Sequence, residues 1–338
     1  MQLPDISIKP EMLYKLVYGT TKSWLLITAI EFEVFDLTAE YRAADEIAAI
    51  LKTHKANTIL FLNALCAIDL LEKKDQAYRN TPLSDTFLVR GKDCYLGQFL
   101  TISEQWNFQT REQMKESIKN GPAPHTDKIG DREDMFAPHV NAMRNYARSG
   151  ISQFMAKQIS RLPEFAGMKK MLELGGAHGM DCIAVTQKSA ELQGIVFDTP
   201  SVIKTTRNII SGYGMEKRVT VMEGDYTTDP IGVGYDLIYA KATLNFFKDN
   251  LDPLFTKIHG ALNPGGLFIS VHDGLTNEGT TPPHMVISWL PTGLSSRDLS
   301  LDRDVIPDAM LRAGFKTVKI TPLSFSMGDS MDMCIGRK

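Results

Sequence analysis

Short apolar segments alternate with helical segments from Met168 onward, and this alternation restricts the possible folds more than any other feature. Strand candidates lie at 170–174, 194–198, 218–222, 235–240 and 266–271, with two final ones at 316–321 and 331–337. Helical stretches such as 181–189 and 202–212 separate them. Strands that alternate with helices of this length predict βαβ units and a mainly parallel sheet.

A glycine-rich turn follows the first of these strands. The segment KMLELGGAHG (170–179) predicts a strand, a turn and the start of a helix near Asp181. Glycine lets the backbone adopt positive φ and approach a ligand closely, and the N–H groups that begin a helix favour a negative group such as a carboxylate. The spacing is not that of the dinucleotide motif GxGxxG, whose later glycines would stand at Ala177 and Met180.

Acidic residues follow at the ends of the next two strands. Asp198 ends the segment GIVFD about 20 residues after the turn, where a carboxylate can accept hydrogen bonds from ribose hydroxyls. Asp225 and Tyr226, in the segment EGDY, end the third strand and could flank an adenine. Because ligands of such sheets bind beyond the carboxyl ends of the strands, the turn and these residues predict one nucleoside site.

The first half of the chain has a different organisation. Residues 11–71 are predicted to be helical and residues 77–80 to form a short strand, which together indicate a winged-helix-like module. Further helices are expected at 95–119 and 133–161. We therefore predict three parts: a first domain at 1–100, linking helices at 101–165 and a second domain at 166–338.

Charge and composition argue against a nucleic acid or a membrane as partner. The formal net charge is −3, and the helix at 56–71, which would have to read a DNA groove, contains no Lys or Arg. The most apolar early stretch, Trp24–Phe35, is interrupted by Glu31 and Glu33, and the N-terminus lacks the apolar core of a signal peptide. Four scattered cysteines indicate reduced thiols in a cytoplasmic protein, and no histidine pair has the spacing of metal ligands.

Five motifs occur in order in the second half: LELGGAHG, VFDTPSVI, VMEGDYT, AKATLNFFKD and ALNPGGLFIS. With them the chain resembles the plant- and bacterial-type small-molecule O-methyltransferases that carry a winged-helix dimerisation domain. The N-terminal half matches mainly in its helical layout and in the segments FxVFDLT and TPLSDTFL. The resemblance implies an α/β fold: a Rossmann-like class I methyltransferase domain with a seven-stranded, mostly parallel sheet, preceded by an all-helical winged-helix-like dimerisation domain. It also implies a homodimer.

The resemblance further implies S-adenosyl-L-methionine as methyl donor, with S-adenosyl-L-homocysteine as product. Gly175 and its neighbours would hold the methionine end of the cofactor, and Asp198 would hold the ribose. Asp225 and Tyr226 would hold the adenine, and Lys241 would line the pocket. The expected cofactor residues are Glu173, Gly175, Gly176, Gly179, Asp198, Asp225, Tyr226 and Lys241.

The histidine base of this family is missing at the expected position. A hydroxyl acceptor must lose its proton, and histidine suits that step at neutral pH. Relatives carry this histidine in a pattern like LHDWxD, whereas the matching segment here, LNFFKD (244–249), has Asn245. Three explanations are open. The substrate is already nucleophilic and Asn245 orients it, or another base serves, either His272 beside Asp273 or His139, or the protein binds the cofactor without methylating.

Aromatic and methionine side chains around these segments are expected to line an apolar pocket for a small substrate, although such spacing is also typical of a plain core. The expected pocket residues are Trp106, His139, Met143, Phe246, Met285 and Trp289. We predict methyl transfer to a small molecule. Family frequency favours an oxygen acceptor, while the loss of the histidine favours sulfur, nitrogen or carbon.

Overall fold

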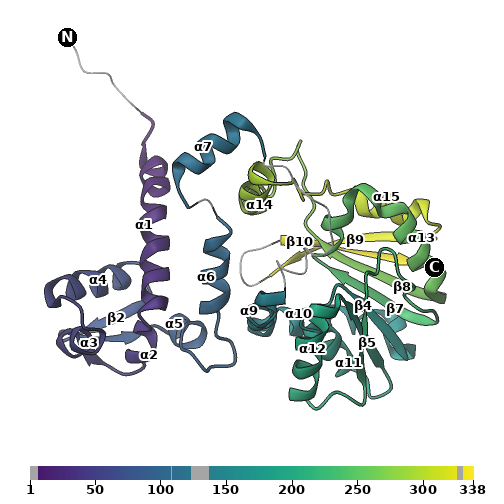
Figure 1. Cartoon of the computed structure of the whole chain (residues 1–338), viewed down its shortest axis with the longest axis horizontal. Helices are drawn as coiled ribbons and strands as arrows, with labels where there is room; N and C mark the ends of the chain where they lie inside the picture. Colours follow the sequence, from purple (N-terminus) through teal and green to yellow (C-terminus); the bar gives the residue numbers. More distant parts are fainter. Residues whose placement is uncertain (1–6, 108, 123–136, 326–329) are drawn as a thin grey trace, which may run out of the picture. The chain divides into compact units, whose positions relative to one another are not determined.

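In the computed structural model the chain divides into two compact units, Met1–Glu104 and Gln105–Lys338. The structure describes residues 7–107, 109–122, 137–325 and 330–338 (Figure 1). No helix in these ranges is long and apolar enough to cross a membrane. The predicted linking helices at 101–165, where described, fall almost entirely within the second unit. The three-part division by function stays a prediction.

The first unit is mainly helical and contains a small antiparallel sheet. Its helices are α1 (Glu11–Glu31), α2 (Val34–Leu37), α3 (Ala44–Leu51), α4 (Lys55–Ala67), α5 (Pro82–Phe87) and α6 (Gly97–Gln105), the last of which ends at the boundary. The strands β1 (Arg42–Ala43), β2 (Leu71–Lys74) and β3 (Ala77–Asn80) pair in the order β1-β3-β2. The sheet includes the strand expected at 77–80, and it adds β1 and β2 to a domain expected to be all-helical.

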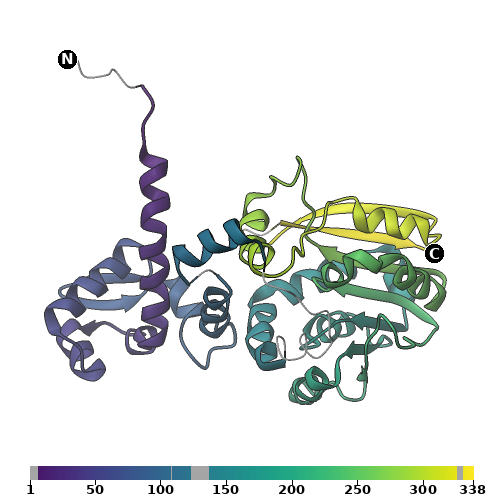
Figure 2. The same ribbon diagram turned by 45° about the horizontal axis from the view of Figure 1, so that its top comes forward.

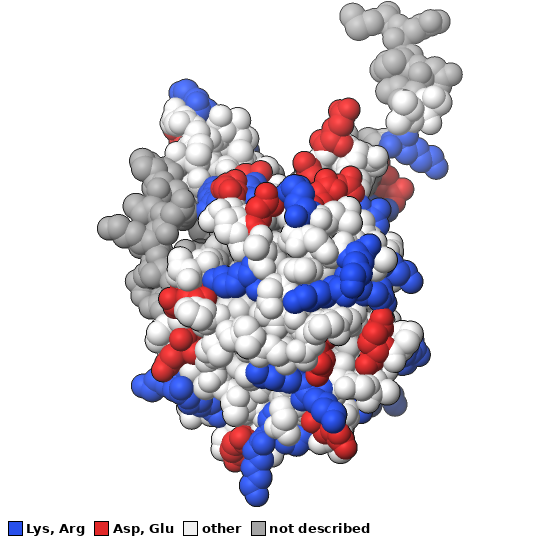
Figure 3. All heavy atoms as spheres, turned by 90° about the vertical axis from the view of Figure 1, so that its right-hand side faces the viewer, with Lys and Arg blue, Asp and Glu red and all other residues white. Residues whose placement is uncertain are grey.

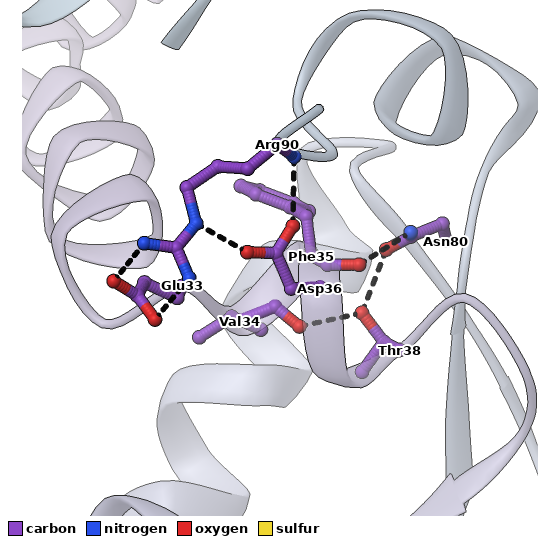
Figure 4. A network of polar contacts seen from close by, with 7 residues as sticks. All are labelled: Glu33, Val34, Phe35, Asp36, Thr38, Asn80 and Arg90. Atoms are coloured by element: carbon purple, nitrogen blue, oxygen red, sulfur yellow. Dashed lines mark hydrogen bonds and ion pairs between the residues drawn. The ribbon is translucent and has the colours of Figure 1, made fainter. Parts of the chain in front are cut away.

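A polar network holds the segment after α1 against β3 (Figure 4). The Asn80 side chain donates a hydrogen bond of 2.8 Å to the carbonyl of Phe35 and accepts one of 2.6 Å from the Thr38 hydroxyl. Thr38 and Asn80 are both buried. Arg90 binds the same segment from the solvent side, because its Nε atom lies 2.6 Å from Asp36 Oδ2. The FxVFDLT segment is therefore fixed by side-chain hydrogen bonds as well as by apolar packing.

The second unit is built on a seven-stranded sheet in the order β6-β5-β4-β7-β8-β10-β9. The strands are β4 (Lys170–Leu174), β5 (Gln193–Asp198), β6 (Val219–Glu223), β7 (Tyr235–Lys241), β8 (Leu262–His272), β9 (Thr317–Ser324) and β10 (Ser330–Arg337). The first five in this order pair in parallel, and β10 is antiparallel to both β8 and β9. The predicted seven-stranded, mostly parallel sheet is confirmed.

Helices cover both faces of this sheet (Figures 1 and 2). The helical elements of the unit are α7 (Arg111–Asn120), η1 (Ala137–His139), α9 (Val140–Tyr146), η2 (Ala147–Ile151), α10 (Ser152–Ile159), η3 (Pro163–Gly167), α11 (Met180–Thr186), α12 (Pro200–Gly212), η4 (Leu244–Asn250), α13 (Leu251–Ala261), α14 (Pro283–Ser295) and α15 (Val305–Arg312). Successive strand residues point to opposite faces. Met171 and Leu237 pack in one core with residues of α10, α11 and α12, and Leu172 and Ile238 pack in the other with residues of α13 and α15.

The distribution of charge on one face and the exposed apolar side chains of α1 bear on which molecules the protein can bind. On the face drawn in Figure 3, Lys and Arg side chains are interspersed with Asp and Glu, so neither sign of charge forms a continuous patch there. In the first unit, α1 exposes a row of large apolar side chains along much of its length. They are Met12, Leu13, Leu16, Val17 and Trp24, each at least 59% exposed.

We expect Asn80→Ala to destabilise the first unit by about 2 kcal/mol, because it removes the donor to the Phe35 carbonyl and leaves the buried Thr38 hydroxyl with only the Val34 carbonyl as partner. Native-state hydrogen exchange of the β3 amides in the full chain measures this change. The neighbouring Arg79→Ala is the control, because it removes an ion pair with Glu72 and a contact with the Tyr41 ring that lie at the surface and outside this network. Equal effects of the two substitutions would contradict the role given to the network.

Candidate functional site

The turn between β4 and α11 has a shape that requires glycine. Gly175 and Gly179 have φ angles of 62° and 69°, a region that residues with a Cβ atom rarely adopt. The Gly175 N–H donates a 2.8 Å hydrogen bond to the carbonyl of Phe197 near the end of β5. A Cβ atom on Gly175 would collide with the Thr243 hydroxyl, so the residues after β7 lie directly against this turn. A Cβ atom on Gly176 would lie 2.8 Å from the Glu173 side chain.

Asp198 at the end of β5 is hydrogen-bonded to the turn. Its Oδ2 atom accepts 2.8 Å from the Ala177 N–H, and its Oδ1 atom accepts 2.7 Å from the Thr199 N–H. Ala177 has a φ angle of 42°, so this small residue adopts the left-handed conformation at a cost of about 1 kcal/mol. Each carboxylate oxygen keeps further acceptor capacity. The structure thus brings the predicted ribose residue to the predicted turn.

A buried ion pair lies behind the turn, in the first residues of α11. The Asp181 carboxylate is completely buried, and it receives Lys241 Nζ at 2.5 Å, the Tyr239 hydroxyl at 3.1 Å and the Ser152 hydroxyl. Burial alone would raise the pKa of Asp181, but the neighbouring Lys241 and the Ser152 hydrogen bond hold it below its ordinary value. Asp181 is therefore ionised, and it compensates the charge of Lys241.

Burial also shifts the pKa values of Glu173 and His178, two further titratable groups of this cluster. Glu173 accepts a 3.0 Å hydrogen bond from the Cys182 N–H, and burial together with Asp181 raises its pKa well above the ordinary value. His178 Nδ1 accepts 3.1 Å from the Met180 N–H, and burial lowers its pKa to about 4, assisted by the nearby Lys241. Burial therefore disfavours the charged form of both groups, while the charges of Asp181 and Lys241 are paired with each other.

Asp225 and Tyr226, the residues expected at the adenine, differ in their surroundings. Asp225 follows β6, and its Oδ1 atom accepts from the N–H and the hydroxyl of Thr227 at 2.9 and 2.6 Å. The Tyr226 ring is only 6% exposed and packs between Phe197 and Phe247, with centroid distances of 6.2 and 5.3 Å. Its hydroxyl lies 2.5 Å from that of Thr243. Tyr226 is therefore part of the core as well as close to the turn, and its contact with adenine stays a prediction.

The catalytic candidates lie after β7 and at the end of β8. Asn245 and His272 are each 1% exposed, and Asn245 Oδ1 and His272 Nε2 have no hydrogen-bond partner among the described residues. His272 Nδ1 lies 3.0 Å from the Ser270 hydroxyl. Burial lowers the pKa of His272 to about 4, although Asp332 acts in the opposite direction. Asp273 Oδ2 accepts a 2.5 Å hydrogen bond from Trp289 Nε1.

Of the six expected pocket residues, two contact each other, one is hydrogen-bonded to Asp273, and three are partly buried. The rings of Trp106 and His139 meet edge to face at 5.9 Å, and Trp289 binds Asp273 as described above. The three partly buried side chains are Met143, Phe246 and Met285. Helices α7 and α14, which belong to the same unit, pack against each other (Figure 1). That all six residues form one substrate pocket stays a prediction.

Sequence reasoning missed several members of the buried cluster, namely Ser152, His178, Asp181 and Tyr239. One signal for Asp181 was present, because a single acid stands in the otherwise apolar run MDCIAV at the start of α11. An acid in such a run is buried and needs a partner. Within the described ranges, no group of three or more His, Cys, Asp or Glu residues is placed to hold a metal ion.

Comparisons with known proteins agree with this geometry. A model of an O-methyltransferase domain matches residues 132–290, and a model of an O-methyltransferase dimerisation domain matches residues 14–90. The N,N-dimethyltransferase OxyT of Streptomyces rimosus is 28% identical over 81% of this chain and 81% of its own. The 3-hydroxy-5-methyl-1-naphthoate 3-O-methyltransferase of Streptomyces sahachiroi is 26% identical over 73% of this chain and 72% of its own. The structure of human N-acetylserotonin methyltransferase in complex with SAM has a TM-score of 0.79, with 20% identity and 99% coverage of both chains.

We expect the protein to lose stability as the pH falls from about 6.5 to about 4. His272 has a pKa of about 4 in the folded chain against its ordinary value of 6.5, so the unfolded chain binds more protons in this window. The loss attributable to this imidazole is about 2 kcal/mol between pH 7 and pH 5. Urea denaturation of the wild type and of His272→Gln at both pH values measures it.

The variant should lose less stability than the wild type over this interval. The exposed His54→Asn, which keeps an acceptor at the start of α4, should behave like the wild type. An unchanged pH dependence in His272→Gln would contradict the assignment of His272 as a buried neutral imidazole.

Proposed function

Because the chain belongs to the family of O-methyltransferases that carry an N-terminal dimerisation domain, we propose that it transfers a methyl group from S-adenosylmethionine to a small-molecule acceptor without a histidine base at position 245. S-adenosylmethionine supplies an electrophilic methyl group on a sulfonium ion. The observation that carries the proposal is the meeting of the Gly175–Gly179 turn with Asp198 and the Thr243–Asn245 segment at one edge of the sheet. The names of the two Streptomyces relatives, both of which describe methyl transfer, support it.

The chemistry of this edge suits the cofactor. A ribose diol needs a carboxylate, and Asp198 provides one whose position is fixed by two backbone N–H groups. A sulfonium ion would be repelled by an uncompensated cation, and the only lysine expected to line the pocket, Lys241, is paired with Asp181. Gly175 and Gly176 leave the backbone of the turn without side chains. Asp198 would hold the ribose and the glycine turn the methionine end.

The acceptor side of the proposal concerns Asn245, His272 and Asp273. Methyl transfer by in-line displacement depends mainly on alignment of the nucleophile with the methyl group, and a buried amide can align a nucleophile by hydrogen bonding. Asn245 has no basic nitrogen, and burial makes His272 a weak base. Asp273 is hydrogen-bonded to Trp289, and it would orient the helix α14 that carries the expected pocket residues Met285 and Trp289. We infer that these groups orient the acceptor.

We also propose that the protein is a homodimer formed through α1. The matched dimerisation domain supports this, as do the exposed apolar side chains of α1, which include Leu13, Leu16 and Val17. Burial of such side chains against a second copy would remove them from water, at a gain of about 25 cal/mol per Å² of apolar surface. Sedimentation equilibrium of the full chain measures the stoichiometry.

Calorimetry of the full chain with S-adenosylmethionine and with S-adenosylhomocysteine tests the cofactor assignment. We expect both to bind, and we expect Asp198→Asn to weaken both about tenfold or more, because a hydrogen bond to a charged group is lost. The control is Asp252→Asn, which changes an exposed acid on α13 that pairs with Arg312. Failure of the wild type to bind either compound would refute the proposed function, and unchanged binding by Asp198→Asn would refute the role of Asp198 alone.

A further inference from the structure

Two buried polar atoms at the proposed acceptor site have no hydrogen-bond partner among the residues that the structure describes, and they restrict what can bind there. They are Asn245 Oδ1 and His272 Nε2, and both belong to side chains that are 1% exposed. A buried polar atom without a hydrogen bond costs about 1–3 kcal/mol, so such atoms are rare unless something else satisfies them. A bound acceptor that carries a hydrogen-bond donor would satisfy Asn245 Oδ1.

The segments that carry these two atoms are held beside the Gly175–Gly179 turn by strand pairing and by the contact of Thr243. In the parallel pairing of β7 with β8, Lys241 stands opposite Val271, so the residues that follow each strand emerge at the same edge. The Ala242 N–H donates 2.9 Å to the Val271 carbonyl, which fixes the start of this segment beside His272. Thr243, two residues before Asn245, contacts the Gly175 turn on the other side. The unsatisfied amide oxygen therefore belongs to a segment held between the turn and the end of β8.

The possible methyl acceptors differ in whether they can donate a hydrogen bond to Asn245 Oδ1. A thioether sulfur offers no hydrogen to Asn245 Oδ1 and a thiol is only a weak donor, whereas a hydroxyl and an amine both donate. A hydroxyl must also give up its proton as the new bond forms, and the amide of Asn245 cannot take it. Burial of His272, which lowers its pKa to about 4, leaves it a weak base for that proton. A neutral amine needs no base before it attacks, because it is a strong enough nucleophile while it still carries its hydrogens and can lose a proton after the new bond has formed.

We propose that the acceptor is a neutral primary or secondary amine whose N–H group donates to Asn245 Oδ1, which directs the nitrogen lone pair at the methyl carbon. This inference rests on the proposed function. The lone pair forms the new N–C bond while the bond from that carbon to sulfur breaks, and the sulfur keeps the electron pair as a thioether. The methylated ammonium then releases its proton to water. The relative from Streptomyces rimosus, which is named an N,N-dimethyltransferase, is consistent with nitrogen as acceptor within this family.

A labelled-methyl assay on matched acceptors tests the proposal with the full chain. The pairs are aniline with phenol and benzylamine with benzyl alcohol, with thiophenol as the sulfur probe. We expect label on the amine of at least one pair, about 100-fold faster than on its hydroxyl partner. Asn245→Leu should lower kcat for that amine about 10- to 100-fold, because it removes the hydrogen bond. Asn245→His should raise transfer to the hydroxyl partner, because it restores a base.

Two controls separate positioning from folding and from cofactor binding. Asn250→Ala changes an exposed asparagine at the end of η4 and should leave the rate unchanged. Calorimetry should show that Asn245→Leu still binds S-adenosylhomocysteine as tightly as the wild type. Loss of cofactor binding in the wild type would refute the proposed function as a whole.

With cofactor binding intact, three results would overturn the amine assignment alone. The first is equal or faster transfer to the hydroxyl or thiol probes, and the second is a wild-type rate for the amine in Asn245→Leu. The third is no label on any amine of the panel.

Discussion

The turn between β4 and α11 is the constraint on which the rest of the second unit depends. Gly175 takes a left-handed conformation that brings Thr243 against it, and the turn is tied to β5 through the carbonyl of Phe197 and the carboxylate of Asp198. Three strands thereby meet at one edge of the sheet. The buried Asp181 pairs with Lys241 immediately behind it, so the strand β7 is joined to α11 by charge as well as by packing.

This arrangement pairs the charges of the buried cluster behind the turn. Asp181 and Lys241 compensate each other, while burial raises the pKa of Glu173 and lowers that of His178 to about 4, so that it disfavours the charged form of both. A cationic methyl donor therefore meets no unpaired cation in this cluster. On the acceptor side, the neutral Asn245 and the buried His272 favour a neutral acceptor over one that must ionise. In both sites the positive charge nearest to the turn is compensated, because Lys241 is paired with Asp181.

Much of this was predictable from the sequence, because periodicity and glycine spacing act locally. Strand β4 is observed exactly where the apolar run predicts it, and Asp198 meets the turn because parallel strands share a carboxyl edge. The cluster around Asp181 was not predictable, because Ser152 and Tyr239 reach it from distant parts of the chain. The burial of the Tyr226 ring was missed for a similar reason, since its neighbours Phe197 and Phe247 come from two other segments. Strand β2 was not predicted, because the helical pattern before it continues to Leu71 without a break.

The most direct test of the central claim is a crystal structure of the full chain with S-adenosylhomocysteine. We expect the ligand at the carboxyl edge of β4, β5 and β7, with its ribose hydroxyls within hydrogen-bond distance of Asp198 and its methionine end against Gly175–Gly179. The Asp181–Lys241 ion pair should be retained. A ligand bound elsewhere in the chain, or bound at this edge without contact to Asp198 and the turn, would contradict the account.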